Sequence, residues 1–185
     1  MPNEVDTAIL KRAQAGDATA LTTLYEQYKP DVYRYLYYRV GRPQLAEDLT
    51  TEVFIRVMEN LSNYRQRNVP FRAWLFQIAR NLTVDYFRKM NRRDDTILDE
   101  KMIAEQPDPE TVAELRLTAD QLQQALQHLP PSQCDVIVLR FIAEMPISQV
   151  AQTLKKSESA IKALQARGLE ALHIILSPQM VPYGK

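Results

Sequence analysis

Residues 69–93 (VPFRAWLFQIARNLTVDYFRKMNRR) constrain the fold more than any other stretch, because their apolar and polar side chains recur with a helical period. The apolar residues follow one another at steps of four, three, four and four, and they are Phe71, Leu75, Ile78, Leu82 and Tyr86. This spacing predicts a single helix that buries one stripe against the rest of the protein.

A second face of the expected helix carries different chemistry, and it consists of Gln77, Arg80, Asn81, Val84 and Arg88. Arginines, an amide and nearby aromatic rings are what a protein needs to hold phosphates and receive unstacked bases. A core helix with a solvated basic face accounts for the same pattern. The helix alone therefore leaves both interpretations open.

The whole chain is predicted to be all-α. Its 185 residues include only four glycines, and alternating Val and Ile runs typical of strands are few. Pro30 is expected to begin a new helix and Ser132 to cap another. Beside 69–93, the expected helices lie at 5–15, 17–28, 30–41, 44–61, 115–129, 133–144, 145–154 and 158–176.

The charges indicate two lobes joined by a linker. Residues 1–93 carry 15 bases and 10 acids (+5), residues 94–114 carry one base and eight acids (−7), and residues 115–185 carry seven bases and five acids (+2). Thirteen of the fifteen aromatic residues lie between Tyr25 and Phe87, so the two lobes need different cores. The predicted organisation is a first domain at 1–93, an acidic linker at 94–114, a second domain at 115–177 and a tail at 178–185.

Several functional classes find no support in the sequence. Cys134 has no partner for an internal disulfide and lies in an apolar stretch, which favours a core position and a reducing compartment. His128 and His173 have no ligands at metal-site spacing, and no glycine-rich phosphate loop is present. We therefore expect no enzyme, no metal and no cofactor. No apolar run is long enough for a membrane span, so membrane insertion is not expected either.

The C-terminal part has the pattern of a helix-turn-helix. A short amphipathic segment (145–154) is followed by Lys155-Lys156-Ser157 and a longer one (158–176), with the small Ala151 where the helices would cross. In such motifs the second helix enters the DNA major groove. Helix pairs with short turns are common, so a free-standing DNA-binding regulator and an all-α interaction protein remain alternatives.

Taken together, these segments resemble the sigma-70 family in its small, two-domain extracytoplasmic-function (ECF) form. AEDLTTEVFIRVMENL resembles the helix that docks on the clamp of core RNA polymerase, and FRAWLFQIARNLTVDYFRK resembles the helix that melts and reads the minus-10 element. LQHLPPSQCDVIVLRF followed by ISQVAQTLKKSESAIKALQARGLEAL resembles domain 4, which reads the minus-35 element.

The resemblance implies a role for individual residues. The polymerase-binding positions would be Asp48, Leu49, Glu52, Phe54 and Arg56. Minus-10 DNA would be met by Asn81, by Tyr64 as a wall for a flipped base, and by Arg80, Arg88, Arg92 and Arg93 on phosphates. Minus-35 DNA would be met by Lys155, Lys156, Ser157, Ser159, Lys162, Ala163 and Arg167.

The resemblance also implies the partners: core RNA polymerase, and promoter DNA as duplex and as single strand, in the bacterial cytoplasm. An anti-sigma factor is a further partner that the family often has. The chain departs from the family pattern at Thr51, where Gln is usual, at Lys155-Lys156, and at 162–164 (Lys-Ala-Leu), where an Arg-Ser-Arg type run is common. Since arginine is the best bidentate reader of guanine, the last departure predicts minus-35 contacts that depend more on phosphates and thymine methyls.

Overall fold

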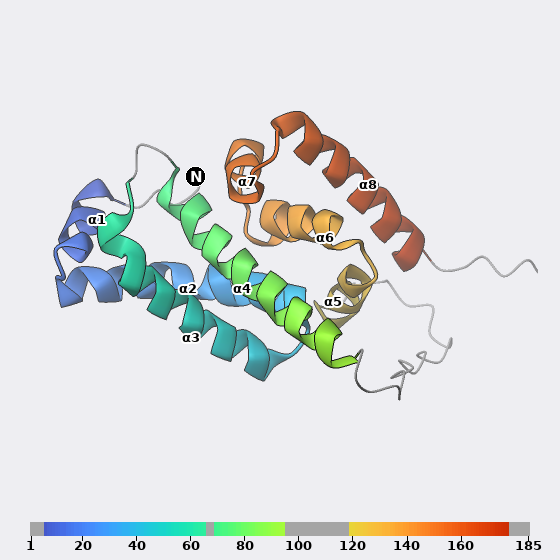
Figure 1. Cartoon of the computed structure of the whole chain (residues 1–185). Helices are drawn as coiled ribbons and strands as arrows, with labels where there is room; N and C mark the ends of the chain where they lie inside the picture. The colour runs from blue at the N-terminus through green and yellow to red at the C-terminus, as the bar shows by residue number, and fades with distance from the viewer. Residues whose placement is uncertain (1–5, 66–68, 95–118, 178–185) are drawn as a thin grey trace, which may run out of the picture.

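The computed structural model describes residues 6–65, 69–94 and 119–177, and all regular secondary structure in these ranges is helical. Figure 1 shows two groups of helices lying side by side. We call residues 6–94 the front lobe, which contains α1–α4, and residues 119–177 the rear lobe, which contains α5–α8. The expectation of an all-α protein with two small helical domains is confirmed.

Helices α1 (Thr7–Gln14) and α2 (Ala18–Val40) each begin at a capping aspartate. The side chains of Asp6 and Asp17 accept hydrogen bonds from backbone N–H groups of the first helical turn, which otherwise have no partner. Helix α2 ends at Gly41, whose φ of 71° lies in the left-handed region that favours glycine. The sequence therefore marks these boundaries locally.

The predicted helix boundary at Pro30 is wrong, because α2 continues through this residue. A proline inside a helix cannot donate to the carbonyl four residues earlier, here that of Glu26. Both Pro30 and Glu26 are exposed, so water can donate a hydrogen bond to this carbonyl. The buried face continues across the proline from Tyr28 to Val32, and its packing maintains one helix of 23 residues.

The front lobe is completed by α3 (Pro43–Asn60), a 3-10 turn η1 (Leu61–Asn63) and α4 (Phe71–Asp94). The predicted apolar stripe of α4 faces the core: Phe71, Leu75 and Leu82 are buried, and Ile78 and Tyr86 are half-buried. The predicted linker start at residue 94 falls on the last residue of α4. The rest of the linker and the tail lie outside the described residues.

The rear lobe consists of α5 (Ala119–Gln127), α6 (Pro131–Ile137), a π-helical segment η2 (Val138–Ile142), α7 (Ile147–Leu154) and α8 (Glu158–Leu176). Ser132 does not cap α6, because the helix already begins at Pro131 and the N-cap position is Pro130. Proline suits the first turn, where no N–H donor is needed. Cys134 is buried in α6, as expected.

The predicted helix-turn-helix is present. Helix α7 ends at Lys155, which has a φ of 53°, and α8 begins after Ser157, whose hydroxyl accepts from the Ala160 N–H at 3.2 Å. The inward face of α8 consists of the buried residues Ile161, Gly168 and Leu172.

The two lobes pack against each other through α2, which contacts α5 and η2, and α4, which contacts α7. In Figure 1, α4 crosses the middle of the molecule, with α2 and α3 on one side and the rear lobe on the other. None of the helices in the described ranges is both long and apolar enough to cross a membrane.

Candidate protein and nucleic-acid interfaces

Helix α3 carries the expected protein-docking residues, but they do not all lie on its surface. Asp48 is exposed and Leu49 is half-buried. Glu52 and Arg56, one turn apart, form an ion pair with Oε1 and Nε 2.9 Å apart. Phe54 is only 7 % exposed. The side chain of Phe54 therefore packs on the inner side of α3 rather than lying on its outer surface.

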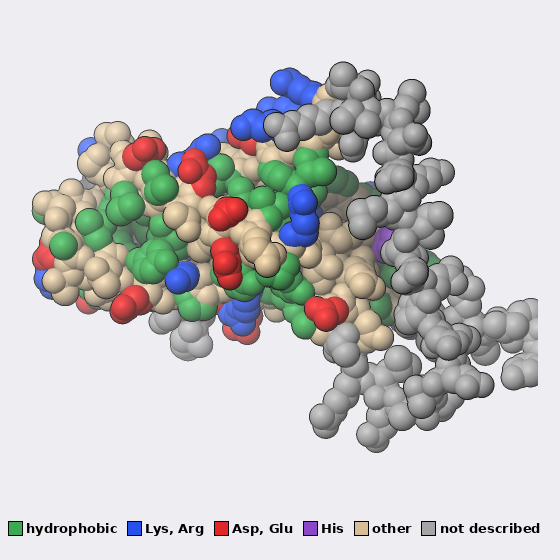
Figure 2. All heavy atoms as spheres, turned by 90° about the horizontal axis from the view of Figure 1, so that it is seen from below, with side chains coloured by type: hydrophobic (Ala, Val, Ile, Leu, Met, Phe, Trp, Pro, Cys, Tyr) green, Lys and Arg blue, Asp and Glu red, His purple; other side chains and the backbone are tan. Residues whose placement is uncertain are grey.

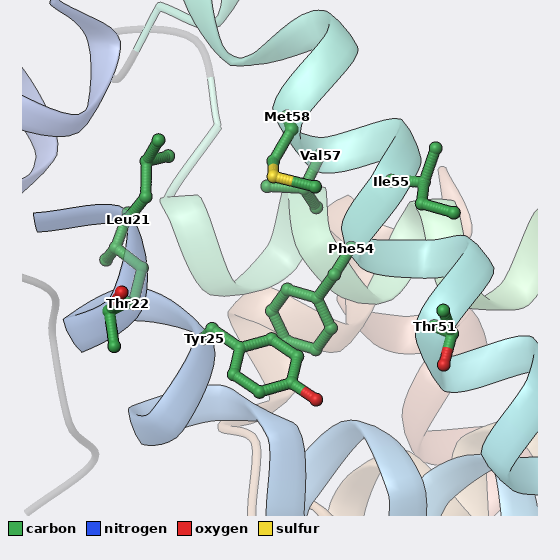
Figure 3. Close-up of a pocket in the computed structure, with 9 residues that line it drawn as sticks. Leu21, Thr22, Tyr25, Thr51, Phe54, Ile55, Val57 and Met58 are labelled. Carbon is green, nitrogen blue, oxygen red and sulfur yellow. The ribbon is translucent and has the colours of Figure 1, made fainter. Parts of the chain in front are cut away.

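An apolar groove lies between α2 and α3, next to these residues (Figure 3). Its volume is about 290 Å³, and its lining is almost entirely hydrophobic. The Tyr25 ring of α2 meets the Phe54 ring of α3 edge to face, with centroids 4.8 Å apart. Ile55 and Met58 are 40 % and 56 % exposed. We call the part of this surface formed by Tyr25, Phe54, Ile55 and Met58 the α2–α3 groove.

The side of the molecule seen in Figure 2 has hydrophobic side chains gathered between acidic ones. On α3 the exposed acids are Glu47, Asp48 and Glu59. A hydrophobic patch rimmed by charges is typical of a protein–protein contact surface. Sequence reasoning missed Ile55 and Met58, although their i, i+3 spacing off the buried stripe was a readable signal.

On α4, the residues expected to contact minus-10 DNA divide into two groups. Asn81, Arg88 and Arg92 are exposed. Arg88 forms an exposed ion pair with Asp85 of the same helix, with 3.5 Å between nitrogen and oxygen. Arg80 instead points to the rear lobe, where its Nε lies 2.9 Å from Oδ2 of Asp135. The side chain of Arg93 lies outside the described residues.

Tyr64 packs on α4 and is not available to a base in this structure. Its side chain is 5 % exposed, and its ring lies 4.8 Å from the Trp74 ring and 5.7 Å from the Phe71 ring between centroids. The hydroxyl donates to the Val69 carbonyl at 2.6 Å. Burial raises the pKa of Tyr64 to about 12. In this structure the Tyr64 ring therefore packs against the start of α4 rather than forming an open wall for a flipped base.

The residues expected to contact minus-35 DNA gather around the turn and first half of α8, and all are exposed: Lys155, Lys156, Ser157, Ser159, Lys162, Ala163 and Arg167. The Ser157 hydroxyl is occupied as the N-cap of α8. A cationic helix start with its outer face exposed is the geometry with which such motifs approach a DNA groove.

A cleft of about 780 Å³ separates the end of α4 from α5 and α6. Four arginines line it, namely Arg39, Arg80, Arg88 and Arg92, and the buried carboxylate of Asp135 lies among them. Arg39 and Asp135 were missed by sequence reasoning, because both lie in predominantly apolar segments whose pattern only indicates burial.

Comparisons with known proteins agree with this architecture. Residues 24–93 match the family model "Sigma-70 region 2", and residues 125–173 match "Sigma-70, region 4". The chain is 38 % identical to the ECF RNA polymerase sigma factor BldN of Streptomyces coelicolor over 172 residues, which are 91 % of this chain and 64 % of BldN. It is 34 % identical to SigX of Bacillus subtilis, another ECF sigma factor, over 80 % of this chain and 79 % of SigX.

The chain belongs to the sigma-70 family, as an ECF sigma factor. Its fold is also similar to that of RpoE from Bartonella quintana, solved as a co-crystal with the anti-sigma factor NepR; the TM-score is 0.67 at 20 % identity, covering 85 % of this chain and 97 % of that one. Sigma factors bind core RNA polymerase and direct initiation at specific promoters, and they are not enzymes. This is the function of the present sigma factor.

Proposed function

We propose that this sigma factor docks on core RNA polymerase through α3 and the α2–α3 groove. The main support for this proposal is that the apolar side chains of Ile55 and Met58 are exposed at a hydrophobic groove, near the exposed Asp48. Burying exposed apolar side chains supplies most of the free energy of association, and rim charges guide the encounter. Glu52 and Arg56 lie beside this surface as an ion pair, and either can exchange its partner for one on the polymerase.

The minus-10 element is assigned to the exposed face of α4. Asn81 can donate and accept hydrogen bonds on a base edge, while Arg88 and Arg92 can neutralise phosphates. Tyr64 then holds the start of α4 in place through the Trp74 and Phe71 rings, and it would reach a base only after leaving them. Arg80 joins the phosphate contacts only when it is released from Asp135.

The minus-35 element is assigned to the helix-turn-helix, with α8 in the major groove. Lys162 and Arg167 face outward from α8, and Lys155, Lys156 and Ser159 flank its start. Lysines contribute mainly by contacting phosphates. The affinity should therefore depend strongly on salt concentration and only weakly on the base sequence. Ala163 offers only a methyl group, suited to a thymine methyl.

The proposed division of the chain is a first domain at 1–93, an acidic linker at 94–114, a second domain at 115–177 and a tail at 178–185. Each lobe alone would bind DNA weakly, and attachment of both to the polymerase raises their effective concentration at a promoter. We place the activity in the bacterial cytoplasm, where transcription occurs. An anti-sigma factor is a proposed partner, supported by the similarity to RpoE, which was solved with one.

A transcription assay tests the proposal. Core RNA polymerase from a bacterium is mixed with the intact protein and genomic DNA, and transcript start sites are mapped. We expect discrete start sites that core polymerase alone does not use, sharing sequences about two helical turns apart. If the protein bound duplex DNA specifically without polymerase and added no start sites, it would be a free-standing regulator and the proposal would fail.

A further inference from the structure

One buried carboxylate of the rear lobe holds two arginines of the front lobe. Asp135, on α6, is 1 % exposed. Its Oδ1 lies 2.8 Å from Nε of Arg39 on α2, and its Oδ2 lies 2.9 Å from Nε of Arg80 on α4. Arg39 is 6 % exposed, whereas the side chain of Arg80 is about one-third exposed, so the cluster extends from the interior of the interface to its edge. We call Asp135, Arg39 and Arg80 the interlobe ion cluster.

Several hydrogen bonds also join the lobes, beside buried hydrophobic residues of both lobes that form one core cluster. The Arg72 guanidinium donates to the Ala143 carbonyl, and the Thr153 hydroxyl donates to the Ala73 carbonyl at 3.2 Å. The Gln127 amide donates to the backbone carbonyls of Tyr38 and Arg39 at 3.1 Å and 3.3 Å. Hydrogen bonds to backbone carbonyls can be exchanged for bonds to water, so these polar contacts do not by themselves prevent the lobes from separating.

We propose that the interlobe ion cluster is an autoinhibitory latch, which keeps the free sigma factor closed and withholds Arg80 from DNA. The Asp135 carboxylate occupies the position on Arg80 that a DNA phosphate would take. While the latch is closed, the lobes also lie against each other and cannot occupy promoter elements about two helical turns, or roughly 70 Å, apart. The role of Arg80 in this inference rests on the function proposed above.

A buried ion cluster can hold two lobes together and still open, because its net contribution to stability is small. Desolvating three charged groups offsets most of their attraction, so an intact cluster contributes little net stability and can open. Removing one charged group of the cluster destabilises the closed state, because the remaining charges stay buried without a partner. In the open state water solvates these charges, so the removal costs much less there. Replacing Asp135 alone therefore shifts the equilibrium toward the open state, by roughly a factor of 100 or more.

The test uses the intact protein and small-angle X-ray scattering, with no polymerase or DNA. Asp135→Lys places a third cation between Arg39 and Arg80, and we expect a clear increase in the radius of gyration with unchanged helical content by circular dichroism. Glu170→Lys makes the same charge change on the exposed face of α8 and should leave the radius of gyration at the wild-type value.

A second variant keeps the inference testable if Asp135→Lys does not fold. Arg80→Glu changes a partly exposed side chain and places a carboxylate against Asp135, so it should also open the protein. Equal radii of gyration for the wild type and the folded variants would overturn the latch. These scattering results do not depend on transcription: a protein that opens as expected but adds no start sites would contradict the proposed function and leave the latch intact.

Discussion

The backbone of Gly168 in α8 lies directly against the side chain of Ile137 in α6. A Cβ atom added to Gly168 would come within 2.8 Å of Ile137 Cγ1, closer than real Cβ contacts allow. Gly168 has an ordinary helical conformation, so what this position requires is space rather than backbone freedom. The close approach sets the distance between α6 and α8.

Gly168→Ala should therefore destabilise the rear lobe. Overpacking of this kind costs about 1–3 kcal/mol, partly offset by the better helix propensity of alanine. The measurement is the midpoint of thermal or urea unfolding followed by circular dichroism. Ala166→Ser adds an atom at an exposed position of the same helix and serves as the control. A Gly168→Ala protein as stable as the control would show that α8 can move away from Ile137 at no cost.

The sequence predicted the elements whose signals are local. The stripe of α4, the cap at Asp17, and the turn between α7 and α8 follow from spacing and capping residues, and the structure has them. The predicted helix boundary at Pro30 was wrong, because a helix tolerates a proline in its middle when the proline faces water and the opposite face of the helix is packed. That condition is a tertiary one, which no local pattern contains.

The candidate sites could be predicted only in part, for a similar reason. The spacing on α4 indicated which residues lie on one face, and Asn81 and Arg88 are exposed there. It could not indicate that Arg80, on the same face, is held by Asp135, which is 55 positions away in the chain. Nor could it indicate that Phe54 is buried while its neighbour Ile55 is exposed, because both are apolar.

The α2–α3 groove predicts which substitutions weaken polymerase binding without unfolding the protein. Replacing Ile55 and Met58 together with serine removes exposed apolar surface, so we expect the Kd for core polymerase to rise at least tenfold while the unfolding midpoint stays nearly unchanged. Ile174→Ser, at a 69 % exposed site on α8, is the matched control. Phe54→Ala is less informative, since a buried ring would be lost as well. Equal affinities for the double variant and the control would remove this groove from the interface.

Asn81→Ala should separate promoter opening from polymerase binding. The amide is exposed on α4, away from the core, so its loss should leave stability and polymerase affinity unchanged. We expect slower strand opening, by roughly 5-fold to 150-fold if one base contact of about 1–3 kcal/mol is lost. Permanganate footprinting of unpaired thymines measures the opening. Gln124→Ala, exposed on α5, is the control. A parallel loss of polymerase binding would count against the role assigned to Asn81.

Lys162→Gln should weaken minus-35 binding in a way that depends on salt. If Lys162 neutralises one phosphate, the slope of log affinity against log salt concentration should decrease in magnitude by about one. The polymerase–sigma complex on duplex promoter DNA provides the measurement, over a range of potassium chloride concentrations. Lys11→Gln, on exposed α1 of the front lobe, should leave the slope as it is. A uniform loss of affinity with an unchanged slope would mean that Lys162 does not contact phosphate.

Tyr64 makes stability depend on pH in the alkaline range. Its pKa is raised from 10 to about 12, because the folded state buries the neutral phenol. The folded state therefore holds this proton more tightly than the unfolded chain, so the contribution of Tyr64 to stability is complete below pH 10. It is lost progressively as the pH rises from 10 to about 12.

Tyr64→Phe should flatten this decline, since phenylalanine keeps the ring against Trp74 but has no proton to lose. Urea unfolding of the wild type and the variant at pH 8, 10 and 11 measures the difference. The variant should be less stable at pH 8, where it lacks the hydrogen bond to Val69, and the gap should narrow at pH 11. Some decline should remain in the variant, because burial also raises the pKa of Tyr35. A gap that stays constant from pH 8 to pH 11 would mean that Tyr64 ionises equally readily in both states, and that its ring does not stay packed against Trp74 and Phe71.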